Sequence, residues 1–259
     1  MLDSLWTIDK SRELYNIGRW SLGYFDFSED GSVDVFPNGP EGSSVNLDSI
    51  KKVSTEENLD LPILFRFNGI LRHRVREMCK AFDEAIVEAE YKGRYYPAYP
   101  IKVNQQHDVV DVLSHVADEC SMGLEVGSKP ELIAALGMQE SGMILCNGYK
   151  DESYIELALM SKKVGRRPII TIEKFSELNL ILDVAERLNV EPEIGFRLRL
   201  AGRGAGRWEK TGGDRAKFGL TISEILNCVK ELERREKLSS LSLLHFHIGS
   251  QLTNIASLR

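Results

Sequence analysis

The pattern of apolar and polar positions changes near residue 61 of this chain. From there onward, short apolar runs alternate with stretches in which apolar residues recur at helical spacing. The runs that predict strands are 61–67, 95–103, 123–126, 143–146, 168–172, 194–200 and 241–248. The stretches that predict helices are 70–91, 107–117, 131–136, 153–163, 175–188 and 223–235. This alternation is typical of βα units that build a parallel sheet.

Two architectures are compatible with this alternating region. An open doubly wound sheet usually carries a Gly-x-Gly-x-x-Gly turn after an early strand, and no such turn follows an early strand here. A (β/α)8 barrel of the TIM type agrees better with the six strands predicted from residue 95 onward, and two βα units are then missing. The chain stops inside a predicted helix that has no cap or stop signal. We therefore expect an α/β fold with an incomplete barrel, in a fragment of a longer protein.

The first sixty residues follow a different pattern. Residues 24–26 and 33–36 read as short strands on either side of a turn, and little looks helical apart from residues 9–20. We therefore expect residues 1–60 to form a separate N-terminal segment and residues 61–259 to form the partial barrel.

Composition and charge narrow the classes of partner. The chain has 259 residues, a net charge of -6 and a pI of about 5.5, without a basic stripe that would indicate nucleic-acid binding. No segment approaches the roughly 18 apolar residues of a membrane span, and the first ten residues lack the apolar core of a signal peptide. The four cysteines are scattered, which favours free buried thiols over a disulfide framework or a zinc site. We expect a soluble, cytoplasmic protein without nucleic-acid or membrane partners.

A lysine near the end of the first barrel strand is the first candidate for chemistry. Active-site groups of a barrel lie at the carboxyl ends of its strands, and Lys102 follows the apolar run Tyr99-Pro100-Ile101. Burial at such a place lowers the pKa of a lysine and makes its amine a nucleophile toward carbonyl groups. The alternative is a lysine that reaches water from the barrel rim.

The last predicted strand carries two histidines. Alternation places His245 and His247 on one face, with His247 nearer the barrel mouth. Gly249-Ser250 then offers a close backbone approach and a hydroxyl group to an anion. The alternative is a pair of hydrogen-bonded core histidines.

Charged residues near two other strand ends are further candidates. Arg197 and Arg199 share one face of their strand, and they need anionic partners if that face points into the barrel. If they point outward, they are only surface charge. Glu125 lies near a strand end and is a candidate partner for a cationic cofactor group. Ser128-Lys129-Pro130-Glu131 also has the sequence of a capping box that opens a helix.

Several motifs together resemble one enzyme family. Their order and spacing are similar to those of the biosynthetic arginine decarboxylases of bacteria, which share the alanine-racemase-like fold of pyridoxal-phosphate enzymes with ornithine and diaminopimelate decarboxylases. The resemblance runs from about Tyr15 to the last residue. The motifs are YNIGRWSLGYFDF, YPIKVNQQ, GLEVGSKPEL, CNGYKDE, RWEKTGGDRAKFGL and LLHFHIGSQ.

The resemblance implies roles for individual residues. Lys102 matches the lysine that forms a Schiff base with pyridoxal 5'-phosphate, His247 matches a histidine stacked on the cofactor ring, and Ser250 matches a serine that binds its phosphate. Lys217 matches a lysine near the subunit interface. The polar residues that match the lining of the cofactor site are Glu125, Glu131 and Arg197.

The resemblance also implies an activity. It predicts decarboxylation of L-arginine to agmatine and carbon dioxide, the first step of polyamine synthesis through agmatine, in a homodimer or larger homo-oligomer that also uses Mg2+. It further implies that residues 1–60 join a β-domain. The family's phosphate loop, pyridine-binding carboxylate and cross-dimer cysteine come after Arg259, so we expect this chain to be inactive alone. The alternatives are the same chemistry on ornithine, diaminopimelate or a carboxylated polyamine, and a non-catalytic cofactor-binding or regulatory homologue.

Overall fold

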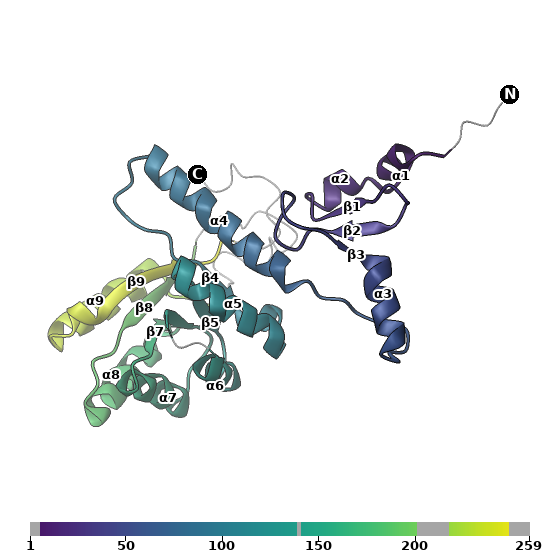
Figure 1. Ribbon diagram of the computed structural model, residues 1–259. Coiled ribbons are helices and arrows are strands. Elements are labelled where there is room, and N and C mark those ends of the chain that lie inside the picture. The colour runs from purple at the N-terminus through teal and green to yellow at the C-terminus, as the bar shows by residue number, and fades with distance from the viewer. Residues whose placement is uncertain (1–5, 139–140, 201–217, 249–259) are drawn as a thin grey trace. The chain divides into compact units, whose positions relative to one another are not determined.

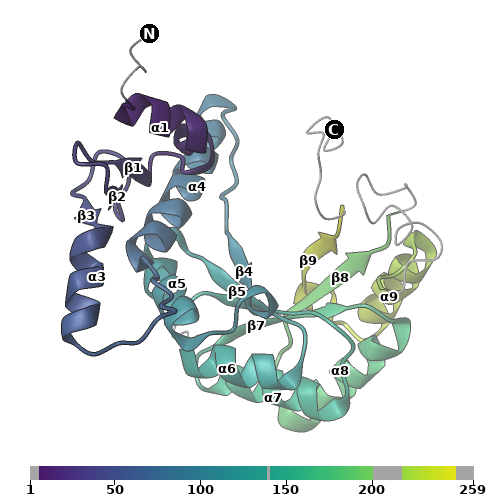
Figure 2. The same cartoon turned by 90° about the vertical axis from the view of Figure 1, so that its right-hand side faces the viewer.

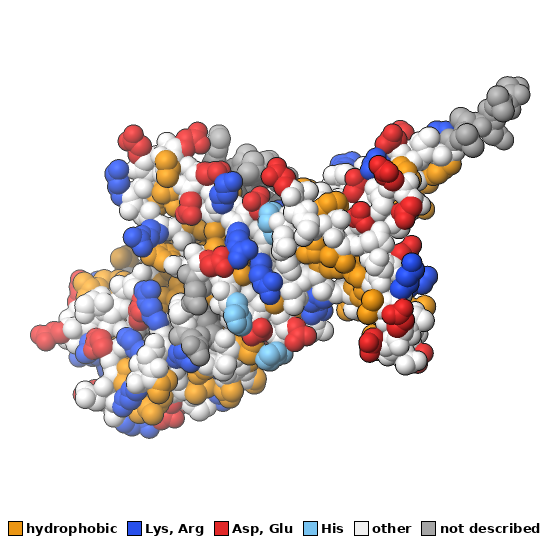
Figure 3. Space-filling view, in the orientation of Figure 1, with side chains coloured by type: hydrophobic (Ala, Val, Ile, Leu, Met, Phe, Trp, Pro, Cys, Tyr) orange, Lys and Arg blue, Asp and Glu red, His pale blue; other side chains and the backbone are white. Residues whose placement is uncertain are grey.

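The computed structural model describes residues 6–138, 141–200 and 218–248 (Figure 1). The chain divides into two compact units, Met1–Tyr95 and Tyr96–Arg259. In the described ranges, no helix combines the length and the apolar character that crossing a membrane requires. Side chains of both charge signs occur on each unit in the face that Figure 3 displays.

The N-terminal unit contains a small antiparallel sheet of order β1-β2-β3 and four helices. The strands are β1 (Phe25–Phe27), β2 (Val33–Val35) and β3 (Val45–Asn46), and the helices are α1 (Ile8–Tyr15), α2 (Ile17–Trp20), α3 (Leu47–Glu56) and α4 (Asn68–Glu88). The predicted strand pair and the helical segment that precedes it are confirmed. The expectation that little else is helical is wrong, because Asn46 caps α3 by accepting hydrogen bonds from the backbone N–H groups of Asp48 and Ser49.

The strand predicted at residues 61–67 is also wrong. These residues have neither strand nor helix structure and lead directly into α4. Apolar side chains there, such as Leu61 and Leu64, are exposed, and an apolar run forms a strand only where another strand pairs with it. Helix α4 belongs to the N-terminal unit by its contacts, since the Tyr24 hydroxyl lies 2.6 Å from Nδ1 of His73. The boundary between the compact units therefore lies at Tyr95 rather than at residue 60.

The C-terminal unit is a parallel sheet of order β4-β5-β6-β7-β8-β9. Its strands are β4 (Ala98–Pro100), β5 (Gly123–Val126), β6 (Met143–Cys146), β7 (Arg167–Ile172), β8 (Ile194–Leu198) and β9 (Leu241–Phe246). Its helices are α5 (His107–Cys120), α6 (Lys129–Met138), α7 (Glu152–Lys163), α8 (Phe175–Leu188) and α9 (Ile222–Arg234). Over the described residues the sheet does not close into a complete barrel, since β4 and β9 remain its two edges.

The strand predictions agree closely with this sheet, with one difference that affects the site. The first barrel strand was expected to continue to residue 103, but β4 ends at Pro100 and a 3₁₀ turn, Ile101–Val103, follows. Proline has no backbone N–H group, so Pro97 and Pro100 each remove a donor from the ladder and limit the strand to a short length. Strand β8 likewise ends two residues earlier than predicted.

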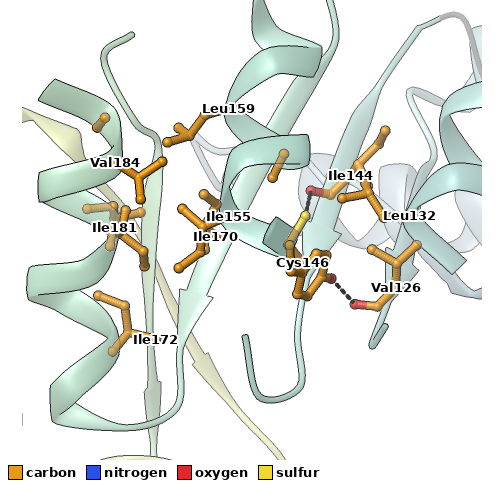
Figure 4. Close-up of a cluster of buried hydrophobic side chains, with 14 of the residues drawn as sticks. Val126, Leu132, Ile144, Cys146, Ile155, Leu159, Ile170, Ile172, Ile181 and Val184 are labelled. Carbon is orange, nitrogen blue, oxygen red and sulfur yellow. Dashed lines mark hydrogen bonds between the residues drawn. The ribbon is translucent and has the colours of Figure 1, made fainter. Parts of the chain in front are cut away.

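Alternation along the strands separates an apolar face from a polar one. On the strands from β5 to β8, side chains of even number, including Ile144, Cys146, Ile170 and Ile172, are buried against Leu159 and its neighbours on the helices (Figure 4). Helices α6, α7 and α8 lie along this outer face of the sheet (Figure 2). The odd-numbered side chains point to the opposite face, so the burial of the even-numbered positions determines which residues line the interior.

Candidate active site

Polar side chains gather at the carboxyl edge of the parallel sheet, where the strand ends lie next to one another. Every strand of the C-terminal unit contributes at least one. In strand order these residues are Lys102, Glu125, Asn147, Glu173, Arg197, His245 and His247.

Lys102 lies on the 3₁₀ turn after β4 and is exposed. Ile101 anchors the turn because its side chain is only 2% exposed. The Tyr99 hydroxyl donates a hydrogen bond of 3.2 Å to the carbonyl oxygen of Asn104 and closes the turn. Of the two interpretations of its position, the exposed side chain agrees with a lysine that reaches water from the barrel rim and not with one buried at the end of a strand. The backbone turn, and not burial of the ammonium group, presents this amine at the edge of the sheet.

The two histidines of the last strand differ in burial. Partial burial, followed by the positive charge of Arg197, lowers the pKa of His245 to about 4, and its Nδ1 is buried without a hydrogen-bond partner in the described residues. His247 is exposed at the end of β9, and its pKa is lowered first by partial desolvation and then by the charges of Arg197 and Lys102. Lys102 is therefore close enough to His247 to act on it electrostatically. Both imidazole rings are neutral at pH 7.

Arg197 lies between a carboxylate and an imidazole in one row across three strands. Strand β7 pairs with β8 at Ile172 and Phe196, and Arg197 pairs with His245 on β9. Nη1 of Arg197 donates a hydrogen bond of 3.0 Å to Oε1 of Glu173, the residue directly after β7. The prediction that an inward arginine needs an anionic partner is confirmed for Arg197. Arg199 instead donates to the carbonyl oxygen of Gly219 at 2.8 Å.

The two glutamates predicted to line the cofactor site have different environments. Glu125 accepts a hydrogen bond of 2.8 Å from Nδ2 of Asn147, at the neighbouring strand end. Glu131 accepts a hydrogen bond of 2.7 Å from the backbone N–H of Gly127, and its own N–H points to the Ser128 hydroxyl at 3.4 Å. Glu131 thus stabilises the turn that opens α6, as the capping interpretation expects.

A buried ion pair lies behind the edge and was not predicted. Lys150, in the connection between β6 and α7, lies 3.7 Å from Glu177 on α8, and the two side chains are 1% and 2% exposed. Burial lowers the pKa of Lys150, and the carboxylates of Glu177 and Glu173 oppose that shift. Lys150 lies within the motif CNGYKDE. Asn147 and Glu173 directly follow predicted strands, so a search of the residues after every predicted strand would have identified both of them.

Ser250 and Lys217 lie outside the described residues, as does most of the motif RWEKTGGDRAKFGL. The residues that are described fit an anionic aldehyde cofactor such as pyridoxal phosphate. They supply a primary amine, a guanidinium group, a neutral imidazole and a carboxylate on one edge. Three buried polar atoms there, Oδ1 of Asn147, Oε2 of Glu173 and Nδ1 of His245, have no hydrogen-bond partner in the described part of the protein, which is typical of a site that binds a ligand.

A parallel sheet covered by helices on its outer face, with an amine and ion-pairing groups at its carboxyl edge, is the arrangement of a barrel enzyme whose active site lies at the strand ends. The family model described as "Pyridoxal-dependent decarboxylase, pyridoxal binding domain" matches residues 72–259. The chain belongs to this family. Its fold is the (β/α)8 barrel of alanine-racemase-like pyridoxal-phosphate enzymes, of which the described residues form six strands.

Individual relatives are similar over nearly the whole chain. A biosynthetic arginine decarboxylase of Rhodopirellula baltica is 46% identical over 260 residues, which cover 100% of this chain and 39% of the relative. One of Vibrio cholerae is 46% identical over 257 residues, covering 97% and 40%. The chain thus spans about two fifths of the length of the curated relatives it matches.

Two solved structures illustrate the fold. The biosynthetic arginine decarboxylase SpeA from Campylobacter jejuni superimposes with a TM-score of 0.82 at 32% identity, covering 94% of this chain and 39% of that one. A diaminopimelate decarboxylase from M. jannaschii superimposes with a TM-score of 0.63 at 20% identity, covering 90% and 50%. The second similarity concerns the fold alone.

Proposed function

We propose that the protein to which this chain belongs decarboxylates L-arginine to agmatine and carbon dioxide with pyridoxal phosphate as cofactor. The observation that carries the reaction class is the set of side chains at the carboxyl edge, where Lys102, Arg197 and His247 follow or end strands of a chain of the pyridoxal-dependent decarboxylase family. The choice of arginine is supported by relatives 46% identical that are named for that substrate.

Each residue of the site has a proposed task. Pyridoxal phosphate, when bound, supplies a conjugated ring that accepts the electron pair of the breaking bond to the carboxylate. Lys102 supplies the amine that holds the cofactor, because its side chain on the 3₁₀ turn is exposed and can reach the cofactor's aldehyde carbon. His247 presents a neutral ring for stacking. Arg197 supplies positive charge for an anionic group, and Glu125 supplies a carboxylate for a cationic one.

Two further residues from the sequence analysis belong to this proposal. Ser250 would bind the cofactor phosphate through its hydroxyl group, as the resemblance implies. Glu131 would act from the edge of the site, because the hydrogen bond from the Gly127 N–H engages one of its oxygens. Both assignments stay predictions.

Wider properties of the whole protein are proposals of the same kind. We expect a homodimer or larger homo-oligomer in the cytoplasm, in which residues 1–60 contribute to a β-domain; the antiparallel sheet β1-β2-β3 supports that last point. Over the described residues, no group of three or more His, Cys, Asp or Glu side chains could hold a metal ion, so no residue is assigned to Mg2+.

A substrate competition tests the proposal. The purified whole protein, supplied with pyridoxal phosphate and magnesium, is assayed for carbon dioxide release from L-arginine, L-ornithine, L-lysine and diaminopimelate. We expect kcat/KM for arginine to exceed the others by on the order of a thousandfold, because a pocket built for a planar guanidinium leaves buried polar groups unpaired with a shorter amine. A higher kcat/KM for another amino acid would overturn the substrate, and absence of release from all four would overturn the activity.

A further inference from the structure

Glu173 is the charged residue of the carboxyl edge that is most completely enclosed by other parts of the fold. Its side chain is fully buried. Oε1 accepts two hydrogen bonds, one of 2.7 Å from the backbone N–H of Gly148 and one of 3.0 Å from Nη1 of Arg197. This single oxygen therefore joins the connection after β6 to strand β8, across the end of β7.

The backbone around Gly148 is shaped for this contact. Gly148 has a φ of +75°, and a Cβ atom there would collide with the carbonyl oxygen of Gly127 at the neighbouring strand end. Glycine therefore allows the chain to turn its N–H group toward Glu173. The position of the carboxylate is set by the fold before any ligand arrives.

Glu177 and Lys150 fix the backbone on either side of the Glu173–Gly148 contact. Glu177 accepts hydrogen bonds from the backbone N–H groups of Lys150 at 3.0 Å and of Glu173 at 2.8 Å. The Lys150 ammonium donates to the carbonyl oxygens of Gly148 and Thr171. Lys150 and Glu177 balance each other in charge, which leaves the charge of Glu173 for Arg197.

We propose that Glu173, held in place by the Lys150–Glu177 pair, is the positioning residue that fixes the Arg197 guanidinium at the carboxyl edge, between Glu173 and His245. This inference rests on the proposed function, because it assigns Arg197 a task in cofactor binding. A guanidinium hydrogen-bonded to a fixed carboxylate loses little further freedom when it meets an anionic group, so the pair preorganises the site.

The geometry distinguishes this role from a general contribution to stability. Glu173 touches Arg197 with one oxygen, while its second oxygen is buried without a partner in the described residues. An unpaired carboxylate oxygen is costly to bury, so the fold does not gain from this arrangement as it would from a fully satisfied pair. The nearest comparison is Glu193, which pairs with Arg167 on the same two strands at the opposite edge, with hydrogen bonds from both Nε and Nη2.

The test measures the dissociation constant of pyridoxal phosphate by titrating the cofactor into the whole apoprotein and following protein fluorescence. Glu173→Gln keeps the shape and the acceptor for Gly148 but removes the charge that holds Arg197. We expect it to raise the dissociation constant about tenfold, the typical effect of losing one charge-assisted hydrogen bond. The matched control, Glu193→Gln, should leave the constant within about twofold of the wild-type value.

A double-mutant cycle separates positioning from general damage. In an Arg197→Met background, Glu173→Gln should weaken cofactor binding by less than about twofold, because the guanidinium that it positions is gone. Glu173→Asp, which retains the charge, should bind the cofactor with a dissociation constant within about threefold of the wild-type value. It also provides the test of the inference if Glu173→Gln does not fold. Equal losses in both backgrounds, or no difference from Glu193→Gln, would overturn the inference while cofactor binding by the wild-type protein still stands. A wild-type protein that binds no pyridoxal phosphate would instead overturn the proposed function.

Discussion

The two edges of the parallel sheet carry the same kind of ion pair in opposite surroundings. Both pairs join β7 to β8: Arg167 with Glu193 at the amino edge, and Glu173 with Arg197 at the carboxyl edge. The first is 2.7 Å long with a largely exposed arginine, and the second is 3.0 Å long with a fully buried glutamate.

At the amino edge, the carboxylates of Glu191 and Glu193 accept hydrogen bonds from neighbouring side chains. Glu193 accepts two hydrogen bonds from Arg167, and Glu191 accepts from Lys237 and Ser240. The pKa of Glu191 is lowered, chiefly by the hydrogen bond from Lys237. Pairs of this kind, open to water, contribute little free energy each.

The carboxyl edge differs from the amino edge in the burial of its charged groups and in its polar atoms without hydrogen-bond partners within the described ranges. It contains buried charges, two histidines with lowered pKa values and, in the described residues, polar atoms without partners. A fold retains such costly groups where chemistry requires them, and a sheet of parallel strands brings them together at one edge only. We therefore expect substitutions at the two edges to differ in their effects on activity and on stability.

The largest expected difference between the edges concerns their lysines. Lys102→Ala in the whole protein should lower kcat/KM for arginine by on the order of a thousandfold or more, because it removes the amine that we assign to the cofactor. Borohydride reduction followed by peptide mapping should find the pyridoxyl group on Lys102 in the wild-type protein. Lys237→Ala at the amino edge should change neither result. A reduced pyridoxyl group on another lysine would contradict the assignment.

The next difference concerns stability. Lys150→Met should destabilise the whole protein by about 3 kcal/mol, because it leaves the buried carboxylate of Glu177 without its cation. Lys162, at the amino edge, donates to the carbonyl oxygen of Glu191, and Lys162→Met should cost less than about 0.5 kcal/mol. Urea unfolding at pH 7 measures both. Equal losses would show that the two edges do not differ in the burial of their charges.

The smallest difference concerns pH. The folded-state pKa of His245 is lowered to about 4, below its ordinary value of 6.5, so the unfolded chain binds more protons between these two values. Stability should therefore rise with pH from about 4 to 6.5 and be lost as the solution is acidified through that window. Allowing for solvent screening of a partly exposed ring, the contribution is about 1 kcal/mol between pH 7 and pH 5.

Two variants measure this contribution. His245→Asn should flatten the pH dependence of the unfolding free energy between pH 7 and pH 5, whereas His115→Asn, on the exposed side of α5, should leave it unchanged. A wild-type slope that survives in His245→Asn would mean that another group is responsible.

The sequence alone determined most of the local structure of the C-terminal unit. Strands β5 and β6 and helix α8 have the predicted bounds, and Lys102, Arg197 and His247 were identified from strand ends and motifs. These features depend on contacts between residues two to four positions apart, which the spacing of apolar side chains records directly.

Only the tertiary structure decided which of these residues meet. The run at residues 61–67 has the apolar character of a strand but no strand pairs with it, and Lys102 is exposed on a turn instead of buried in a strand. The row of Glu173, Arg197 and His245 depends on the register of β7, β8 and β9, whose paired residues lie 24 and 48 positions apart. The alternation within each strand excludes a slip of one residue, which would move every side chain to the other face, but it does not choose among registers that differ by two residues. That choice depends on hydrogen bonds and packing between strands that are distant in the chain.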